Sequence, residues 1–209
     1  MLDVLSAVLL GVFVLSCLKL ASQARFLAGD RELLSLTPDD TVDASVTIIV
    51  PMRNESRNIR ACLESLLAQD YRNYQVLVID DDSSDDSVAI VESLGNNDKL
   101  RLLKMTPEAI AEKDRWVSKK ACVLWNAAKA VDSDWVLFMD ADTRIYPSSL
   151  KRVMTYVHKH GLGAYSGSGL YPNPGILGDA VESFLYLVLF SILPLGKVQD
   201  PKSSIAWMN

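Results

Sequence analysis

The sequence predicts an α/β domain whose sheet is mostly parallel and carries helices on both faces. Two short, continuous apolar runs, at residues 46–50 and 75–79, are typical of strands buried on both faces. Each run is followed by a segment with apolar residues at helical spacing. Because parallel strands need helical crossovers, regular alternation of strand and helix favours this fold over a meander or a bundle.

The expected elements run in order from residue 46. The first strand stops at Pro51, and the following helix lies within residues 54–69, with Asn54 as its expected N-cap. The remaining elements are a strand at 75–79, a helix at 84–94, a strand at 99–105, a helix at 121–131 and a strand at 135–139.

The N-terminal segment differs from this domain in composition. Residues 4–18 contain no charge, and the apolar stretch is just long enough to cross a hydrocarbon core of about 30 Å. Positive charges follow it, which places the downstream chain in the cytoplasm by the positive-inside tendency. The sequence therefore predicts a single-pass membrane anchor at 1–22, a linker at 23–44 and a cytoplasmic domain at 45–209. The alternatives are a signal peptide, which lacks a basic start here, and an apolar helix buried against a partner.

The overall composition narrows the class of protein. Of the 209 residues, 49% are hydrophobic and 22% are charged, which is ordinary for a globular chain. The net charge of −5 argues against a nucleic-acid partner. The three cysteines are widely spaced within apolar patterns, so we interpret them as reduced packing residues.

Polar residues gather where three of the expected strands end. In parallel sheets, ligands bind at the carboxyl ends of the strands, near the point where strand order reverses. The residues at these ends are Arg53, Asn54 and Glu55 after the first strand, Asp80, Asp81 and Asp82 after the second, and Asp140 and Asp142 after the fourth.

Asp140 and Asp142 form the most informative pair. The period of two along a strand end points both carboxylates the same way, and converging carboxylates repel unless a cation lies between them. Oxygen ligands without histidine or thiolate favour Mg²⁺ or Mn²⁺, with open positions that phosphate oxygens fill. The alternative is that both are ordinary cap or turn residues. The Asp80–Asp82 run has the same alternative beside a role in binding a base or ribose.

Two lysines precede this pair in the chain. Lys119 and Lys120 lie at or before an expected helix N-terminus, where lysine opposes the helix dipole. A bound anion would explain them, because the helix end and both ammonium groups would attract it together. A solvated basic turn is the alternative.

Together these segments resemble family 2 glycosyltransferases of the GT-A fold, a Rossmann-like fold. The resemblance rests on "TIIVPMRNESRNIRACLESLLAQDY", "QVLVIDDDSSDDS", "KKACVLWNAAKAV" and "WVLFMDADTRIYPSSL", in the family's order. Lys120 lies twenty residues before Asp140, a separation typical of the family. The N-terminal segment and the "RW…KK" region most resemble membrane-linked, hopanoid-associated and ceramide-glucosyltransferase-like members.

The resemblance implies a role for each matching residue. The implied function is transfer of a sugar from a nucleoside diphosphate donor, UDP-linked by expectation, to a lipid or cell-envelope acceptor. The cofactor would be Mg²⁺ or Mn²⁺, and the reaction would invert the sugar. The implied residues are Pro51, Arg53, Asn54 and Glu55 beside the nucleotide, Asp80 or Asp81 on the base, Lys120 at the diphosphate, and Asp140 and Asp142 on the metal.

Two departures from the family pattern matter. The family's second strand usually ends Asp-Asp-Gly, and Asp82 stands here in place of the glycine. The general base is expected beyond Asn209, so the chain is interpreted as truncated, with no catalytic base identified in it. Asp179 and Glu182 are the nearby carboxylates, and a solvated helical face explains them better. The apolar run at 183–195 is too short to span a membrane and is expected to be a core or interfacial helix.

Other functions compete with this one. The first is a non-catalytic module, or inactive fragment, that binds a nucleotide sugar. The second is a receiver-like signalling domain phosphorylated in the Asp80–Asp82 run, which leaves Asp140 and Asp142 unexplained. A nucleotidyltransferase would want a glycine-rich loop after the first strand, and "PMRNES" contains no glycine.

Overall fold

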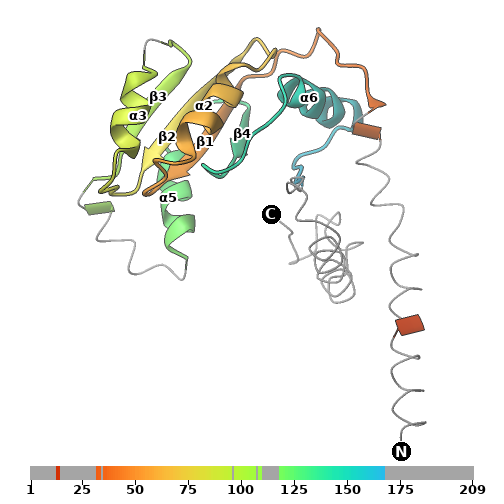
Figure 1. Cartoon of the computed structure of the whole chain (residues 1–209). Helices are drawn as coiled ribbons and strands as arrows, with labels where there is room; N and C mark the ends of the chain where they lie inside the picture. The colour runs from red at the N-terminus through yellow and green to blue at the C-terminus, as the bar shows by residue number, and fades with distance from the viewer. Residues whose placement is uncertain are drawn as a thin grey trace, which may run out of the picture. The chain divides into compact units, whose positions relative to one another are not determined.

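The structure is a computed structural model, and it describes residues 13–14, 32–33, 35–95, 97–106, 108–109 and 118–167. Residues 37–161 form one compact unit, which holds the described elements from β1 to α6 (Figure 1). Nearly all of the expected anchor, the apolar run at 183–195, Asp179 and Glu182 lie outside the described residues. Within the described ranges, no helix has the length and apolar character needed to cross a membrane.

A four-stranded parallel sheet forms the centre of this unit. Its strands lie in the order β3-β2-β1-β4, and each neighbouring pair is parallel. Because β2 and β4 flank β1 on opposite sides, the strand order reverses at β1, and a crevice is expected at the carboxyl ends there. The bounds of the strands are β1 Val46–Met52, β2 Tyr74–Asp80, β3 Leu100–Lys104 and β4 Trp135–Phe138.

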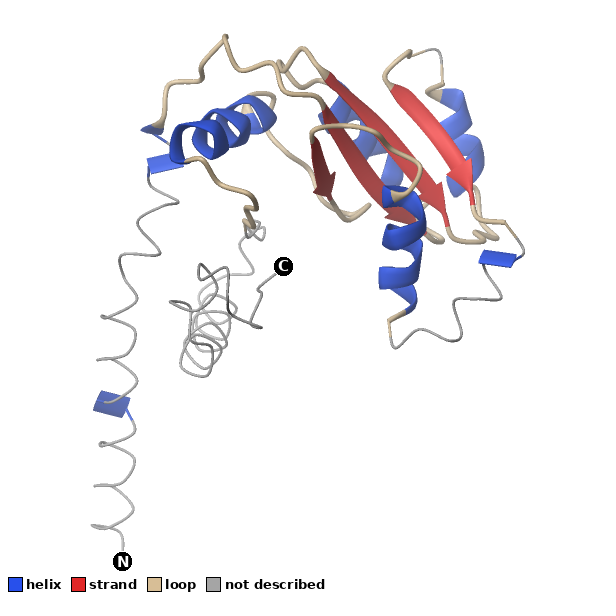
Figure 2. Cartoon of the chain, turned by 180° about the vertical axis from the view of Figure 1, so that it is seen from behind, coloured by secondary structure: helices blue, strands red, loops and turns tan. Residues whose placement is uncertain are grey.

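Helices cover both faces of the sheet, which confirms the predicted architecture. Figure 2 shows α5 on one face, with α2 and α3 on the other. The bounds of the helices are α2 Ile59–Leu67, α3 Ser87–Ser93, α5 Lys119–Ala128 and α6 Ser149–His160.

The alternation of side chains along β1 builds two separate cores. Ile48 lies in the larger cluster, together with Leu63 of α2 and Met154 of α6. Ile49, the next residue, lies in the smaller cluster with Val123 of α5. Both β1 residues are fully buried, as expected for a strand covered on both faces.

Two local expectations were wrong. The helix α2 begins at Ile59 with Asn58 as its N-cap, and not at Asn54. Asn54 instead has a φ of 55°, a left-handed conformation that asparagine tolerates better than most residues. The strand β4 ends at Phe138, so Asp140 and Asp142 lie in a turn rather than on alternating strand positions. The Thr143 N–H donates to the Asp140 carbonyl (3.1 Å) and closes that turn.

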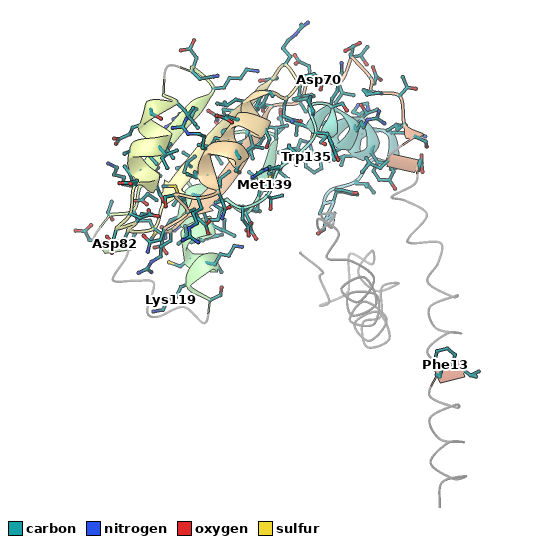
Figure 3. The ribbon with its side chains drawn as sticks, in the orientation of Figure 1. Phe13, Asp70, Asp82, Lys119, Trp135 and Met139 are labelled. Atoms are coloured by element: carbon teal, nitrogen blue, oxygen red, sulfur yellow. The ribbon has the colours of Figure 1, made fainter. Side chains whose placement is uncertain are left out.

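Asp82 occupies the position where the family pattern has glycine. Its φ of 62° is left-handed, which explains the preference for glycine at this turn. Figure 3 shows Asp82 and Lys119 at the lower left of the domain, the side on which β1 and β2 end. The turn therefore keeps its left-handed geometry with aspartate in it.

We expect the residue type at position 82 to affect the stability of the domain, because residue types differ in how well they tolerate a left-handed backbone. Left-handed backbone costs roughly 1–2 kcal/mol for ordinary residues and much less for glycine. Asp82→Val should therefore lower the free energy of unfolding by about 1–2 kcal/mol, and Asp82→Gly should leave it equal or higher. Urea unfolding followed by circular dichroism measures both. Equal stability of the valine and glycine variants would contradict the strained turn.

Candidate functional site

A cavity of about 280 Å³ lies at the carboxyl ends of β1, β2 and β4. It is the place where the reversal of strand order predicts a ligand. Its walls come from the loop after β1, the end of β2, the first turns of α5 and the turn after β4. The lining residues are Pro51, Met52, Arg53, Glu55, Asp81, Lys120, Val123, Asp140, Ala141 and Asp142.

The charged side chains on these walls do not balance. Four are carboxylates and two are cations, which leaves an excess of two negative charges. An anionic ligand such as a diphosphate would be repelled by this excess. A divalent cation would cancel it, because a single Mg²⁺ or Mn²⁺ carries the missing charge. The four carboxylates are Glu55, Asp81, Asp140 and Asp142, and the two cations are Arg53 and Lys120.

Lys120 and Asp140 form an ion pair across the cavity. Lys120 is the second residue of α5, whose N-cap Ser118 accepts a hydrogen bond from the Ala121 N–H (3.2 Å). The helix start therefore fixes where the lysine stem leaves the backbone. Since both side chains remain about half exposed, the pair contributes little to stability, and its ammonium can reach another anion.

Arg53 and Asp81 form a second, looser pair on the wall. The guanidinium Nη1 lies 3.8 Å from Asp81 Oδ2. The side chain of Asp81 is only 13% exposed, and its backbone N–H donates to the Met52 carbonyl (2.8 Å). This backbone bond joins the end of β2 to the end of β1, so the Asp81 carboxylate is held in the cavity.

Two of the predicted donor-binding residues do not line the cavity. Asp80 is only 6% exposed, and its Oδ1 accepts a hydrogen bond from the Ser83 N–H (3.2 Å). Asn54 turns its Oδ1 toward the Ser84 N–H (2.8 Å). Both side chains therefore hold the turns beside the cavity, and of Asp80 and Asp81 only Asp81 lines the cavity.

A network centred on Asp85 joins the loops after β1 and β2. Its carboxylate accepts hydrogen bonds from the backbone N–H groups of Ser56 (3.1 Å) and Ser87 (3.0 Å), and from the Ser87 hydroxyl. Ser87 Oγ in turn accepts from the Glu55 N–H (2.8 Å). Hydrogen bonding from the Ser87 side chain, above all, holds the pKa of Asp85 well below its usual range. Glu55 is thereby fixed at the cavity rim.

Asp85 and the apolar wall residues were missed in the sequence. Asp85 lies two residues before Ser87, a spacing typical of a turn that precedes a helix. The hydrogen bond between them could therefore have been predicted from the sequence. Met52, Val123 and Ala141 form the buried apolar part of the wall. Nothing in the apolar pattern distinguishes these three from ordinary core residues.

The donor set fits a hard divalent cation rather than zinc. Asp140 and Asp142 present only carboxylate oxygens, and the nearby Cys62 is unsuitable because burial raises the pKa of its thiol to about 12. In the part of the chain that the structure describes, no group of three or more His, Cys, Asp or Glu side chains could enclose a metal. Two carboxylates leave most coordination positions open, the arrangement that Mg²⁺ and Mn²⁺ adopt with phosphate ligands.

The parallel sheet and the carboxylate-rich cavity at its strand ends define an α/β protein with a site suited to a phosphorylated ligand. The sequence from residue 47 to residue 185 matches the family Glycosyl transferase family 2, which is more than half of the chain. The chain therefore belongs to glycosyltransferase family 2, and the resemblance stated above is confirmed at that level.

Individual relatives are between about a quarter and a third identical to this chain over the residues that align. Poly(ribitol-phosphate) β-N-acetylglucosaminyltransferase TarS of Staphylococcus aureus is 31% identical over 143 residues, covering 67% of this chain and 23% of that protein. Poly-β-1,6-N-acetyl-D-glucosamine synthase of S. aureus is 24% identical over 166 residues, covering 78% and 38%. The uncharacterized glycosyltransferase YibD of Escherichia coli is 28% identical over 112 residues, covering 53% and 29%. The chain thus spans well under half the length of these relatives.

Solved structures also align with part of the chain. A mannosyltransferase from Pyrobaculum calidifontis, in complex with GDP-Man and Mn²⁺, aligns with a TM-score of 0.48 at 24% identity, covering 68% of this chain and 44% of that one. S. aureus TarS 1–349 in complex with UDP aligns with a TM-score of 0.46 at 25% identity, covering 61% and 38%.

Proposed function

We propose that this chain carries the donor-binding part of a glycosyltransferase that uses a nucleoside diphosphate sugar, with UDP as the nucleotide. One observation supports this most directly. Asp140, Asp142 and Lys120 meet in one cavity at the carboxyl ends of a parallel sheet. Two carboxylates beside one ammonium suit a diphosphate that arrives with a divalent cation.

The walls divide naturally between the two ends of such a donor. The diphosphate would lie against Lys120, at the N-terminus of α5, where the backbone N–H groups and the ammonium attract an anion together. The nucleoside would lie toward Pro51, Arg53 and Asp81, where a held carboxylate can accept hydrogen bonds from a base or ribose.

Asp140 and Asp142 are the residues that would hold the cation. When bound, Mg²⁺ or Mn²⁺ supplies Lewis-acid stabilisation of the negative charge on the departing nucleoside diphosphate. The residues of the protein hold the cation and the diphosphate in place. The turn after β4 holds both carboxylates at the cavity, and Lys120 adds a positive charge on the opposite wall.

The acceptor is proposed from the names of the relatives. One S. aureus relative is named as a synthase of an N-acetylglucosamine polymer. The other is named as an N-acetylglucosaminyltransferase that acts on poly(ribitol-phosphate). We therefore propose a UDP-hexose or UDP-N-acetylhexosamine as donor and a cell-envelope glycan or lipid as acceptor. The proposal extends to an inverting reaction, in which a general base deprotonates the acceptor hydroxyl.

The membrane setting is also part of the proposal. The charge-free run at 4–18 and the positive residues that follow support a single-pass anchor at 1–22 and a cytoplasmic domain. A lipid acceptor would then approach from the same membrane, as expected of hopanoid-associated or ceramide-glucosyltransferase-like members. Reaction of introduced cysteines with membrane-impermeant reagents, on either side of the run, tests this topology.

A non-catalytic nucleotide-sugar-binding module is the second candidate. It is favoured by the lining of the cavity, because all four carboxylates there already have a proposed role in binding the cation or the donor. Release of UDP from UDP-glucose and UDP-N-acetylglucosamine by the full chain with Mn²⁺ separates the two. Metal-dependent release supports a transferase, whereas donor binding without release supports the module.

A further inference from the structure

The buried side chain of Gln69 makes three hydrogen bonds, two of them to the segment that follows the Asp140–Asp142 turn. Gln69 follows the C-cap of α2 and is 6% exposed. Its Nε2 donates to the carbonyl oxygens of Ser65 (2.9 Å) and Tyr146 (2.9 Å). Its Oε1 accepts from the Leu150 N–H (3.0 Å). A single amide therefore links the end of α2, the loop after β4 and the first turn of α6.

Gln69 also completes the N-terminus of α6. The N-cap of that helix, Ser148, makes no side-chain cap hydrogen bond. The Leu150 N–H is one of the first four of the helix, which have no partner within it, and Gln69 Oε1 supplies the acceptor. The start of α6 is thus fixed by a residue eighty-one positions earlier in the chain.

Two further side chains of α2 contact the same segment. The Cys62 thiol donates to the Asp140 carbonyl (Sγ to O, 3.7 Å), and Ser65 Oγ accepts from the Ile145 N–H (3.3 Å). Residues 62, 65 and 69 recur at intervals of three and four, so they lie along one side of α2 and its C-terminal extension. This line of contacts follows residues 140–150 from the carboxylate turn to the start of α6.

The contacts matter because that segment carries both acidic residues of the cavity. Asp140 and Asp142 lie in a turn beyond the end of β4, and the last hydrogen bond to the sheet before them runs from the Met139 N–H to the Ile49 carbonyl (3.0 Å). The backbone that follows them is secured at Ile145, Tyr146 and Leu150 by Ser65 and Gln69. A shift of this backbone would move the two carboxylates relative to Lys120.

We infer that Gln69 is a positioning residue, which holds the Asp140–Asp142 turn in the geometry that binds the metal–diphosphate group. This inference rests on the proposed function. An amide is required because the site presents two carbonyl acceptors and one N–H donor, which Nε2 and Oε1 satisfy together. A glutamate has the same shape, but its carboxylate oxygen would replace Nε2 opposite the two carbonyl oxygens. It would repel them instead of donating hydrogen bonds to them.

Gln69→Ala and Gln69→Glu are the test variants, and Tyr74→Phe is the matched control. The Tyr74 hydroxyl is also buried and donates to Leu66 O (3.0 Å) and Leu67 O (3.2 Å), at the same end of α2. Its loss weakens this helix end without touching residues 140–150. Comparing the variants therefore separates positioning of the acidic turn from general loss of stability.

The experiment measures two properties of the full chain. The first is the affinity for Mn²⁺ in the presence of UDP, by electron paramagnetic resonance. We expect it to fall about tenfold in both Gln69 variants, the lower end of the effect of removing a residue that orients metal ligands, and to stay within about twofold in Tyr74→Phe. The second is hydrogen exchange at the Thr143 amide, which bonds to Asp140 and does not contact Gln69. It should become faster in the Gln69 variants only.

Each outcome decides one of the two claims. Unchanged Mn²⁺ affinity in folded Gln69→Ala, or an equal loss in Tyr74→Phe, would overturn the positioning role. A wild-type chain that binds neither Mn²⁺ nor UDP would contradict the proposed function instead. In that case Thr143 exchange still decides whether Gln69 holds the turn: faster exchange supports it, and unchanged exchange overturns it.

Discussion

Replacing Asp142 with asparagine is expected to weaken Mn²⁺ binding by at least about a hundredfold. Asparagine keeps the size of the side chain but removes the charge that attracts the cation. Changes outside the ligand shell already cost roughly 10–100-fold in affinity, so loss of a ligand charge should reach or exceed the upper end of that range. The same result is expected for Asp140→Asn, whose carboxylate lines the same cavity.

Asp132→Asn is the matched control for these two variants. It removes one negative charge from an exposed residue that does not line the cavity, ten positions before Asp142. Titration of Mn²⁺ followed by electron paramagnetic resonance, with UDP present, should show unchanged affinity in this control. Mn²⁺ binding that survives in both Asp140→Asn and Asp142→Asn would show that the cation does not bind at these two carboxylates.

Replacing Leu63 with alanine is expected to cause the largest loss of stability. Leu63 is fully buried on α2, in the same cluster as Ile48 and Val50 of β1. Truncation of such a leucine removes apolar contacts and leaves a cavity, which costs about 2–5 kcal/mol. Domains of this kind have a total stability of only about 5–15 kcal/mol, so a substantial part of it would be lost.

Urea unfolding monitored by circular dichroism measures this change. Arg60→Ala is the control, because Arg60 lies on the exposed side of the same helix and makes one side-chain hydrogen bond, to Ser93 Oγ (3.2 Å). Its free energy of unfolding should change by no more than about 0.5 kcal/mol. A similar small change in Leu63→Ala would mean that α2 does not pack on the sheet as described.

The sheet and its helices could be predicted because burial leaves a clear pattern in the sequence. Residues 46–50 and 76–79 are all buried, and all but Thr47 are apolar, as expected for strands that are covered on both faces. The apolar spacing of Ile59, Cys62, Leu63 and Leu66 matches the buried side of α2. In these segments local pattern and tertiary burial agree.

The ends of the elements could be predicted less well, because tertiary contacts decide them. Asn54 is a good N-cap by residue type, but its side chain bonds to the Ser84 N–H of another loop, and its φ is left-handed. The helix therefore starts four residues beyond the end of the "PMRNE" stretch, at Ile59. A helix-capping rule considers only neighbouring residues, so it cannot predict the hydrogen bond between Asn54 and Ser84.

The same limit applies to the candidate site. The family spacing indicated that Lys120 and Asp140 belong to one site but not that they form an ion pair, which the structure shows at the ends of α5 and β4. The sequence did not distinguish Asp80 from Asp81, since adjacent aspartates differ only in the direction of their side chains. The role of Gln69 could not be predicted, because two of its three partners, Tyr146 and Leu150, lie more than seventy residues away in the chain.

The central claim is that the cavity binds a nucleoside diphosphate together with a divalent cation. Calorimetric titration of UDP into the full chain, with Mn²⁺ in one experiment and with EDTA in the other, tests it most directly. We predict saturable binding with one UDP per chain in Mn²⁺ and none in EDTA. Equal binding under both conditions, or no binding to a folded chain in Mn²⁺, would contradict the account.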